Sequence, residues 1–213
     1  MRREQSKAEA AGQAVDRAVL GLLPEDAMRA DLYDLLAALL VRPPAAGLLA
    51  GVAALEGDGT PLGKAVNMLA RLAGSVSERS VEREFSAMFI GLGRGEVLPY
   101  ASYYMTGFLN EHPLARLRAD MADLRIARSG DVSEPEDNLA ALCEMMAGMI
   151  RGRFGMAVPL ERQKEFFNTH MAPWAAHCFA DMEKAEAAVL YAGVGRVGRE
   201  FMEVEAETMR MVK

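Results

Sequence analysis

Apolar residues recur at three- and four-residue intervals along most of this chain, and no stretch alternates convincingly between apolar and polar residues as a half-buried strand would. This periodicity constrains the fold more than any other feature, because it gives each successive segment the apolar stripe of an amphipathic helix. It predicts an all-α protein with a single domain over residues 1–213, built of about nine to eleven helices in two loosely divided halves. The stretch 113–133 is the best candidate for a boundary, or hinge, between the halves.

Capping residues, prolines and glycines divide the periodic pattern into separate helices. Ser75 and Glu78 have the spacing of a capping box ahead of the helix that begins near residue 79, and Gly91, Gly93 and Gly95 together stop that helix. The expected helices are 24–41, 45–55, 62–73, 79–92, 114–128, 134–153, 160–171, 173–191 and 195–211, with a further short helix that ends near His112 and Pro113.

The helix expected from residue 134 opens with an acidic stretch, "GDVSEPEDNLAALC". Ser133 is the expected N-cap, Glu136 completes a capping box, and Pro135 lies in the first turn, where its missing N–H is not needed. Capping does not account for Asp137. That side chain is either a solvated acid or one that faces a ligand, and the pattern leaves both interpretations open.

Charge and composition exclude several classes of protein. The net charge is −6, and no cluster of Lys and Arg with interleaved aromatic residues indicates binding to nucleic acid. No apolar run approaches the roughly 20 residues that cross a membrane, and Arg2 and Arg3 are not followed by the apolar segment of an export signal. We therefore expect a cytoplasmic protein, in which the distant Cys143 and Cys178 are core residues and not a disulfide.

Motifs typical of enzymes are present only in fragments. "GVGRVG", Gly193 to Gly198, matches a dinucleotide-binding pattern, but it follows a helical segment and leaves too little chain for a βαβ unit. His112, His170 and His177 lack the spacing of zinc ligands. We therefore predict no catalytic residues, no metal site and no cofactor.

Three segments carry a resemblance to a known family. "EFSAMFIGLGRGEVLPYASYY", "EPEDNLAALCEMMA" and "QKEFFNTHMAPWAAHCFADMEKA", in this order and with these separations, resemble the TorD/DmsD family of cytoplasmic chaperones for molybdenum oxidoreductases. The similarity runs from about Asp31 to Met209.

The resemblance implies an all-helical, non-enzymatic protein that binds the twin-arginine signal peptide of an oxidoreductase precursor. Such a chaperone delays export of its client until the molybdenum cofactor is inserted and the client has folded. The resemblance also implies a monomer that can coexist with a domain-swapped dimer.

The family's motifs single out a set of candidate residues for binding the signal peptide. They are Pro99, Tyr100, Ser102, Tyr104, Glu134, Asp137, Asn138, His170 and Trp174. The family has histidine where this chain has Asn138, and asparagine cannot become a cation near neutral pH. Phe167, Met171 and Trp174 also fall on one helix face, which favours a mainly core role for them.

Physical chemistry makes such a ligand plausible for these residues. A twin-arginine signal presents guanidinium groups followed by an apolar segment, so its receptor needs carboxylates beside an adaptable apolar groove. Asp137, the loop from Pro99 to Tyr104 and the 15 methionines could supply both. Two alternatives remain: a helical adaptor without affinity for signal peptides, and a hydrolase or nucleotide-binding protein, although the chain contains no phosphate loop.

Overall fold

The computed structural model describes residues 22–127 and 134–212, and these form ten α-helices and one π-helical segment with no strand among them. The prediction of an all-α fold is therefore confirmed. The elements are α2 (Pro24–Leu40), α3 (Ala46–Ala53), α4 (Pro61–Ser75), α5 (Glu78–Phe85), η1 (Ser86–Ile90), α6 (Ala101–Thr106), α7 (His112–Asp123), α8 (Leu139–Arg151), α9 (Leu160–His170), α10 (Ala175–Lys184) and α11 (Leu190–Met211).

The start of α5 differs from the predicted one. Ser77 is the N-cap, and its side chain and that of Ser80 form a reciprocal capping box. Ser75 still belongs to α4, where its hydroxyl donates to the carbonyl of Leu72. The predicted capping box of Ser75 and Glu78 is therefore wrong, since the N-cap lies two residues later. In the observed box, Ser80 takes the position that glutamate usually fills.

The chain between residues 100 and 124 also divides differently from the prediction. The short helix α6 ends at Thr106, and Gly107 follows it with φ +84°, a left-handed conformation that favours glycine. His112 and Pro113 begin α7 and do not end α6. Proline suits this first turn because its nitrogen has no hydrogen to leave unpaired.

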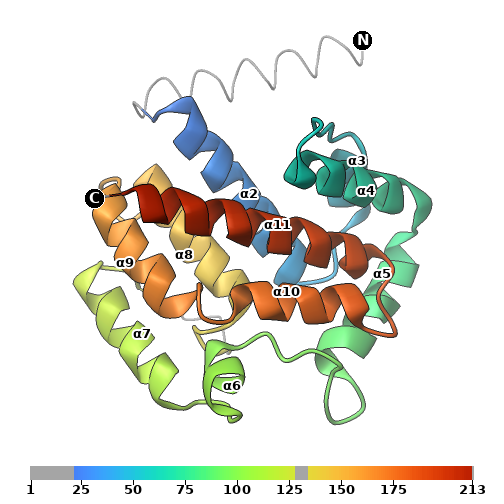
Figure 1. The fold of residues 1–213 in the computed structure, drawn as a ribbon. Coiled ribbons are helices and arrows are strands. Elements are labelled where there is room, and N and C mark those ends of the chain that lie inside the picture. The colour runs from blue at the N-terminus through green and yellow to red at the C-terminus, as the bar shows by residue number, and fades with distance from the viewer. Residues whose placement is uncertain (1–21, 128–133, 213) are drawn as a thin grey trace.

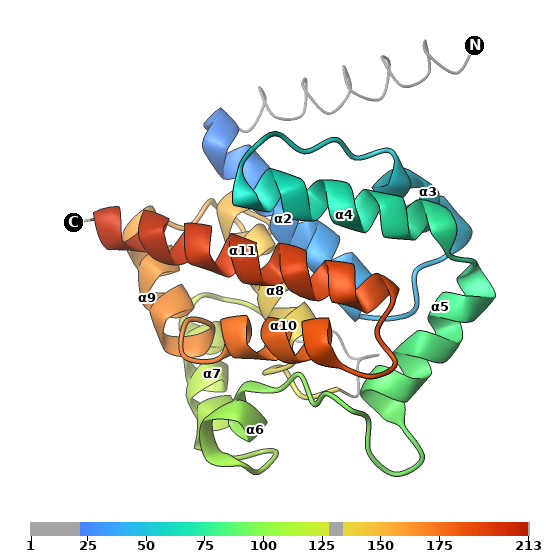
Figure 2. The same ribbon diagram turned by 45° about the vertical axis from the view of Figure 1, so that its right-hand side comes forward.

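The long helix α11 contains the whole "GVGRVG" stretch, so this stretch is not a phosphate-binding loop. Its glycines bring α11 close to its neighbours. A Cβ atom on Gly198 would lie 2.2 Å from Cδ1 of Phe179 on α10, and one on Gly193 would lie 2.9 Å from Cδ1 of Leu72 on α4. Figures 1 and 2 both show α10 and α11 side by side. The apparent cofactor motif is a helix-packing motif.

The N-terminus of α11 is capped by an acid from another helix. The buried carboxylate of Glu84 accepts hydrogen bonds from the backbone N–H groups of Val189 and Tyr191, both at 2.7 Å, and of Leu190 at 3.1 Å. Such charge-assisted bonds satisfy the free N–H groups and oppose the positive end of the helix dipole. The chain therefore breaks between α10 and α11 at 185–189, and the predicted helices 173–191 and 195–211 misplace that break.

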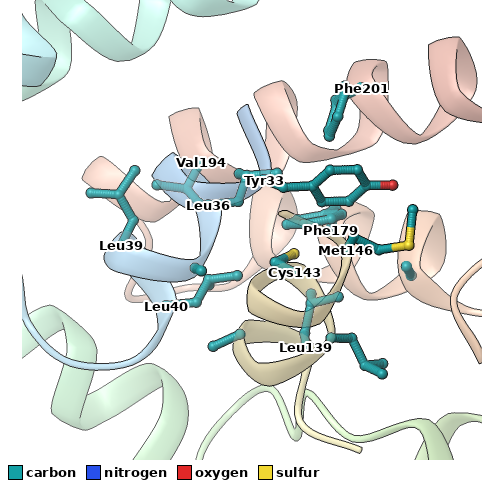
Figure 3. Packing of buried hydrophobic residues seen from close by; sticks show 14 of the residues in the cluster. Tyr33, Leu36, Leu39, Leu40, Leu139, Cys143, Met146, Phe179, Val194 and Phe201 are labelled. Carbon is teal, nitrogen blue, oxygen red and sulfur yellow. The ribbon is translucent and has the colours of Figure 1, made fainter. Parts of the chain in front are cut away.

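The core lies where α2, α8, α10 and α11 meet. Figure 3 shows side chains from these helices converging, among them Tyr33 of α2, Cys143 of α8, Phe179 of α10 and Val194 of α11. Cys143 and the other cysteine, Cys178, are both free thiols with no exposed surface, which confirms their predicted core role.

Helices from the two ends of the described chain are joined inside this core. Nε of Arg29 on α2 donates to Glu205 on α11 at 2.7 Å, and the hydroxyl of Tyr33 donates to the same carboxylate at 2.9 Å. Both charged side chains are buried, and they satisfy each other together with Tyr33 and with Asp26, which accepts from Arg29 at 2.8 Å.

The predicted boundary at 113–133 is not tested by this fold and stays a prediction. It contains most of α7, while its last part, 128–133, lies outside the described residues. Within the two described stretches, no helix is both long enough and apolar enough to cross a lipid bilayer.

Candidate functional site

Two segments that are distant in sequence pair with each other and carry most of the predicted site residues. The N–H of Ala101 donates to the carbonyl of Asp137 at 3.0 Å, and the N–H of Leu139 donates to the carbonyl of Pro99 at 2.8 Å. These two bonds flank Tyr100 in a short antiparallel pairing. The loop before α6 and the segment before α8, called here the paired segments 97–101 and 134–139, therefore bring most of the predicted residues together.

Asp137 lies inside this pairing and has no exposed surface. Its Oδ2 accepts a hydrogen bond from the backbone N–H of Ser102, in the first turn of α6, at 2.8 Å. The solvated interpretation of Asp137 is therefore wrong. Its Oδ1 and the buried hydroxyl of Ser102 have no hydrogen-bond partner within the described chain.

Asn138 is the N-cap of α8, since its Oδ1 accepts from the N–H of Ala140 at 2.9 Å. The predicted helix start at residue 134 and its capping box are therefore wrong, and Ser133, the expected cap, lies outside the described residues. Glu136 instead accepts hydrogen bonds from the Arg118 guanidinium on α7, at 2.8 and 3.0 Å. An asparagine caps a helix as well as a serine does, which is why the helix can begin here.

Tyr100 and Glu134 form the part of the paired segments that faces solvent. The phenol of the half-buried Tyr100 donates to the carboxylate of the exposed Glu134. Burial, together with this acid, raises the pKa of Tyr100 to about 12, so the phenol stays a neutral donor across the physiological range. The pair presents an aromatic ring beside a carboxylate at the surface.

Tyr104 connects α6 to the third motif. Its hydroxyl donates to Asp181 on α10 at 2.8 Å, and its ring lies 5.3 Å from the ring of Trp174, centroid to centroid. Trp174 is buried, and its indole N–H donates to the carbonyl of His170 at 2.6 Å. Trp174, together with Phe167 and Met171, has the core position that its helical spacing predicts.

His170 is also buried, and its Nε2 lies 2.7 Å from Oδ2 of Asp120 on α7. Burial lowers the pKa of His170 below its usual 6.5, and the acid opposes this effect. Asp120 and Phe166, whose ring packs against the imidazole, also line an open cavity of about 370 Å³ between α7 and α9. In the described part of the chain, no group of three or more His, Cys, Asp or Glu side chains could hold a metal ion.

Exposed apolar side chains near α6 complete the surface, and sequence periodicity missed them. Met105, Phe108 and Leu109 lie at and beyond the end of α6, and Phe108 is 70% exposed. The signal for Phe108 and Leu109 is a turn sequence, "TGFLN", with apolar residues that belong to no helical stripe. Arg94, in the loop after η1, stacks over the ring of Tyr103 at 5.0 Å and so holds that loop against α6.

The predicted site residues thus divide by depth. Tyr100 and Glu134 meet at the surface, and the half-buried Tyr104 lies in the adjoining helix α6. Pro99, which precedes Tyr100 in the paired segments, is buried. The remaining side chains lie within the protein or cap a helix: Ser102, Asp137, Asn138, His170 and Trp174. Their roles in binding stay predictions.

Parts of this chain are similar in sequence to known proteins. Residues 55–180, more than half of the chain, match a family model described as nitrate reductase delta subunit. The chain is 25% identical over 127 residues to the chaperone protein TorD of Vibrio cholerae, which covers 56% of this chain and 58% of the relative. It is 28% identical over 96 residues to TorD of Aliivibrio fischeri, which covers 42% of this chain and 45% of the relative. The chain thus spans less than two thirds of the length of these curated relatives.

A solved structure shows the same fold. The crystal structure of a protein described as a putative redox enzyme maturation protein, from Archaeoglobus fulgidus, superimposes with a TM-score of 0.57 at 19% identity. The match covers 83% of this chain and 94% of the other.

Proposed function

Because the chain belongs to the nitrate reductase delta subunit family, in agreement with its resemblance to the TorD/DmsD chaperones, we propose that it is a maturation chaperone for a redox enzyme. In this proposal it binds the twin-arginine signal peptide of a molybdenum-containing oxidoreductase precursor. Binding delays export from the cytoplasm until the cofactor is inserted and the client has folded. The role is one of binding, without catalysis.

One observation carries this proposal most directly: the paired segments expose Tyr100 and Glu134 side by side. A carboxylate binds a guanidinium through charge-assisted hydrogen bonds, and an aromatic face adds a cation–π contact. The pair therefore suits one arginine of the signal peptide. A single exposed ion pair contributes only about 1 kcal/mol, so this contact sets the register of the peptide and supplies a small part of the affinity.

The apolar part of a signal peptide needs an apolar surface nearby, and α6 leads to one. This six-residue helix is about 9 Å long, since an α-helix rises about 1.5 Å per residue. The paired segments lie at its N-terminal end, while Met105, Phe108 and Leu109 lie exposed at and beyond its C-terminal end. A peptide with arginines at Glu134 and apolar residues along α6 would match both ends.

Titration of a fluorescently labelled twin-arginine peptide tests the proposal at two salt concentrations. Glu134→Gln should weaken binding by roughly fivefold, the equivalent of about 1 kcal/mol, and should flatten the salt dependence because one ionic contact is lost. Phe108→Ser should weaken binding by roughly tenfold or more with an unchanged salt dependence, because it removes apolar contact alone.

A peptide with both arginines replaced by glutamine is the matched control ligand. If the wild-type chain binds both peptides equally, or neither, signal-peptide recognition is refuted, and a helical adaptor becomes the better description. Mass spectrometry of proteins that co-purify with the chain then identifies the actual partner. An oxidoreductase precursor that retains its signal peptide would support the chaperone role.

A further inference from the structure

We infer that Asp137 is a positioning residue. From inside the protein it holds α6 and the segment 97–101 in place, and it makes no contact with a peptide arginine. This inference rests on the proposed function and assigns roles within the proposed site. It separates two acids, Asp137 and Glu134, that lie only three residues apart in one motif.

Burial is the first argument. Asp137 has no exposed surface, and backbone hydrogen bonds on both sides of Tyr100 close the pairing over it. A guanidinium could reach this carboxylate only if those bonds opened. Glu134, by contrast, is exposed beside Tyr100. A peptide arginine can therefore approach Glu134 without opening the pairing.

Asp137 already binds the backbone at the start of α6. Its Oδ2 accepts from the backbone N–H of Ser102, which lies in the first turn of α6. The N-cap of this helix, Tyr100, makes no side-chain capping bond. A helix of six residues is too short to be stable by itself, so it depends on outside contacts. Asp137 supplies the cap that a local serine or asparagine would otherwise provide.

The helix α6 connects the two ends of the proposed surface. Tyr100 immediately precedes the helix, and Phe108 and Leu109 follow closely after it. Tyr104, within the helix, contacts Trp174 and Asp181. Loss of the cap would therefore displace both ends of the proposed surface together, although Asp137 itself never reaches that surface.

Asparagine and alanine separate the two roles of an aspartate at this position. In the Asp137→Asn variant, the amide oxygen of the new side chain can still accept from the N–H of Ser102, but the charge is gone. Alanine removes both the acceptor and the charge. A positioning role needs the acceptor, whereas a direct ion pair needs the charge.

The experiment compares Asp137→Asn and Asp137→Ala in the peptide titration at two salt concentrations. We expect Asp137→Asn to bind within about threefold of wild type with the same salt dependence, and Asp137→Ala to lose roughly tenfold or more in affinity. Asp123→Asn is the charge control, because it removes an exposed acid from the end of α7.

The single tryptophan supplies a second measurement. Trp174 lies against Tyr104 of α6, so its emission spectrum reports whether the helix keeps its place. The emission should be unchanged in Asp137→Asn and altered in Asp137→Ala. If the alanine variant does not fold, the asparagine variant alone decides the question.

The outcomes that overturn the inference differ from those that overturn the proposed function. One outcome overturns the inference alone: Asp137→Asn loses roughly tenfold in affinity, has a flattened salt dependence and keeps its tryptophan emission. Asp137 would then contact the peptide directly, and signal-peptide binding would stand. If the wild-type chain does not distinguish the arginine peptide from its glutamine control, the proposed function is wrong, and the positioning role goes with it.

Discussion

Burying a carboxylate costs several kcal/mol unless other groups satisfy it, and the described residues bury five of them. Each has found hydrogen-bonding or ionic partners. Glu84 and Asp137 accept from backbone N–H groups at helix starts, Glu136 and Glu205 accept from arginines, and Glu200 pairs with two arginines. These five acids are therefore part of the structure and do not belong to the solvated surface.

Burial of His170 makes the stability of the fold depend on pH. Its pKa lies below 6.5 in the folded chain, while Asp120 and Arg116 of α7 face it with opposite effects. Because the unfolded chain binds a proton more readily than the folded one, stability is complete above pH about 6.5 and falls as the pH drops through the lowered folded pKa. We expect the melting temperature to fall between pH about 7.5 and pH about 5 for this reason.

The variant His170→Gln should lower the melting temperature at every pH, because it loses the packing against Phe166, but it should flatten the decline in this window. His177→Gln is the control, since His177 is exposed, and it should keep the decline of the wild type. Melting curves at several pH values measure both effects. A decline that persists unchanged in His170→Gln would assign it to other groups.

Sequence patterns predicted which residues gather at the site better than they predicted what each residue does. The burial of Trp174 agrees with its helical periodicity, and Tyr100 and Glu134, which the family's motifs single out separately, lie in contact. The role of Asp137 could not be predicted, because its partner Ser102 lies 35 residues earlier and a local pattern contains no information about such contacts. The capping role of Asn138 could not be predicted either, because Ser133 and Glu136, which precede it, have the spacing of a capping box.

The presence of each helix could be predicted from the sequence, but the residues at which it begins and ends could not. The described helices lie close to the periodic stretches, but α8 and α11 begin where Asn138 and Glu84 provide hydrogen-bond acceptors. Glu84 belongs to α5 and lies 107 residues before Tyr191, whose N–H donates to it. Helix ends are decided by the satisfaction of free N–H groups, and the acceptor can come from anywhere in the fold.

The glycines of α11 give a prediction at this scale. Gly198→Ala would place a Cβ 2.2 Å from the ring of Phe179, so α10 and α11 must separate or the ring must move. Overpacking of this kind costs about 1–3 kcal/mol, which exceeds the gain of up to about 1 kcal/mol from the higher helix propensity of alanine. We expect a net loss of stability in chemical denaturation.

Gly51→Ala is the matched control for this substitution. Gly51 lies in α3, and no neighbouring atom lies within 4 Å of the position that an added Cβ would occupy. Alanine should therefore bring only the propensity gain and raise stability by up to about 1 kcal/mol. Equal effects of the two substitutions would mean that α10 and α11 are not held in close contact by the glycines.

At the scale of the whole molecule, the two ends of the described chain share one core. α2 near the start and α11 at the end are joined by Arg29 and Glu205, and the ring of Tyr33 packs edge-on against Phe201 at 4.7 Å. α11 in turn contacts α4 and α10, so helices from early and late in the chain bury one another. Neither end can leave without exposing the other.

This arrangement predicts one cooperative unfolding transition, despite the boundary expected at 113–133. Far-UV circular dichroism follows all helices, whereas the fluorescence of Trp174 follows the region around α6, α9 and α10. We expect both signals to give the same midpoint in denaturant. Glu205→Gln, which removes the buried charged partner of Arg29 and leaves it paired with Asp26, should lower both midpoints together by an amount equivalent to roughly 3 kcal/mol.

Arg210→Gln is the control for this last substitution, because the ion pair of Arg210 with Glu207 is exposed and should contribute little to stability. Two separate midpoints, with Glu205→Gln shifting only the circular dichroism, would show that the halves unfold independently. Sedimentation of the wild type would then be expected to reveal a domain-swapped dimer beside the monomer, because independent halves can exchange between chains.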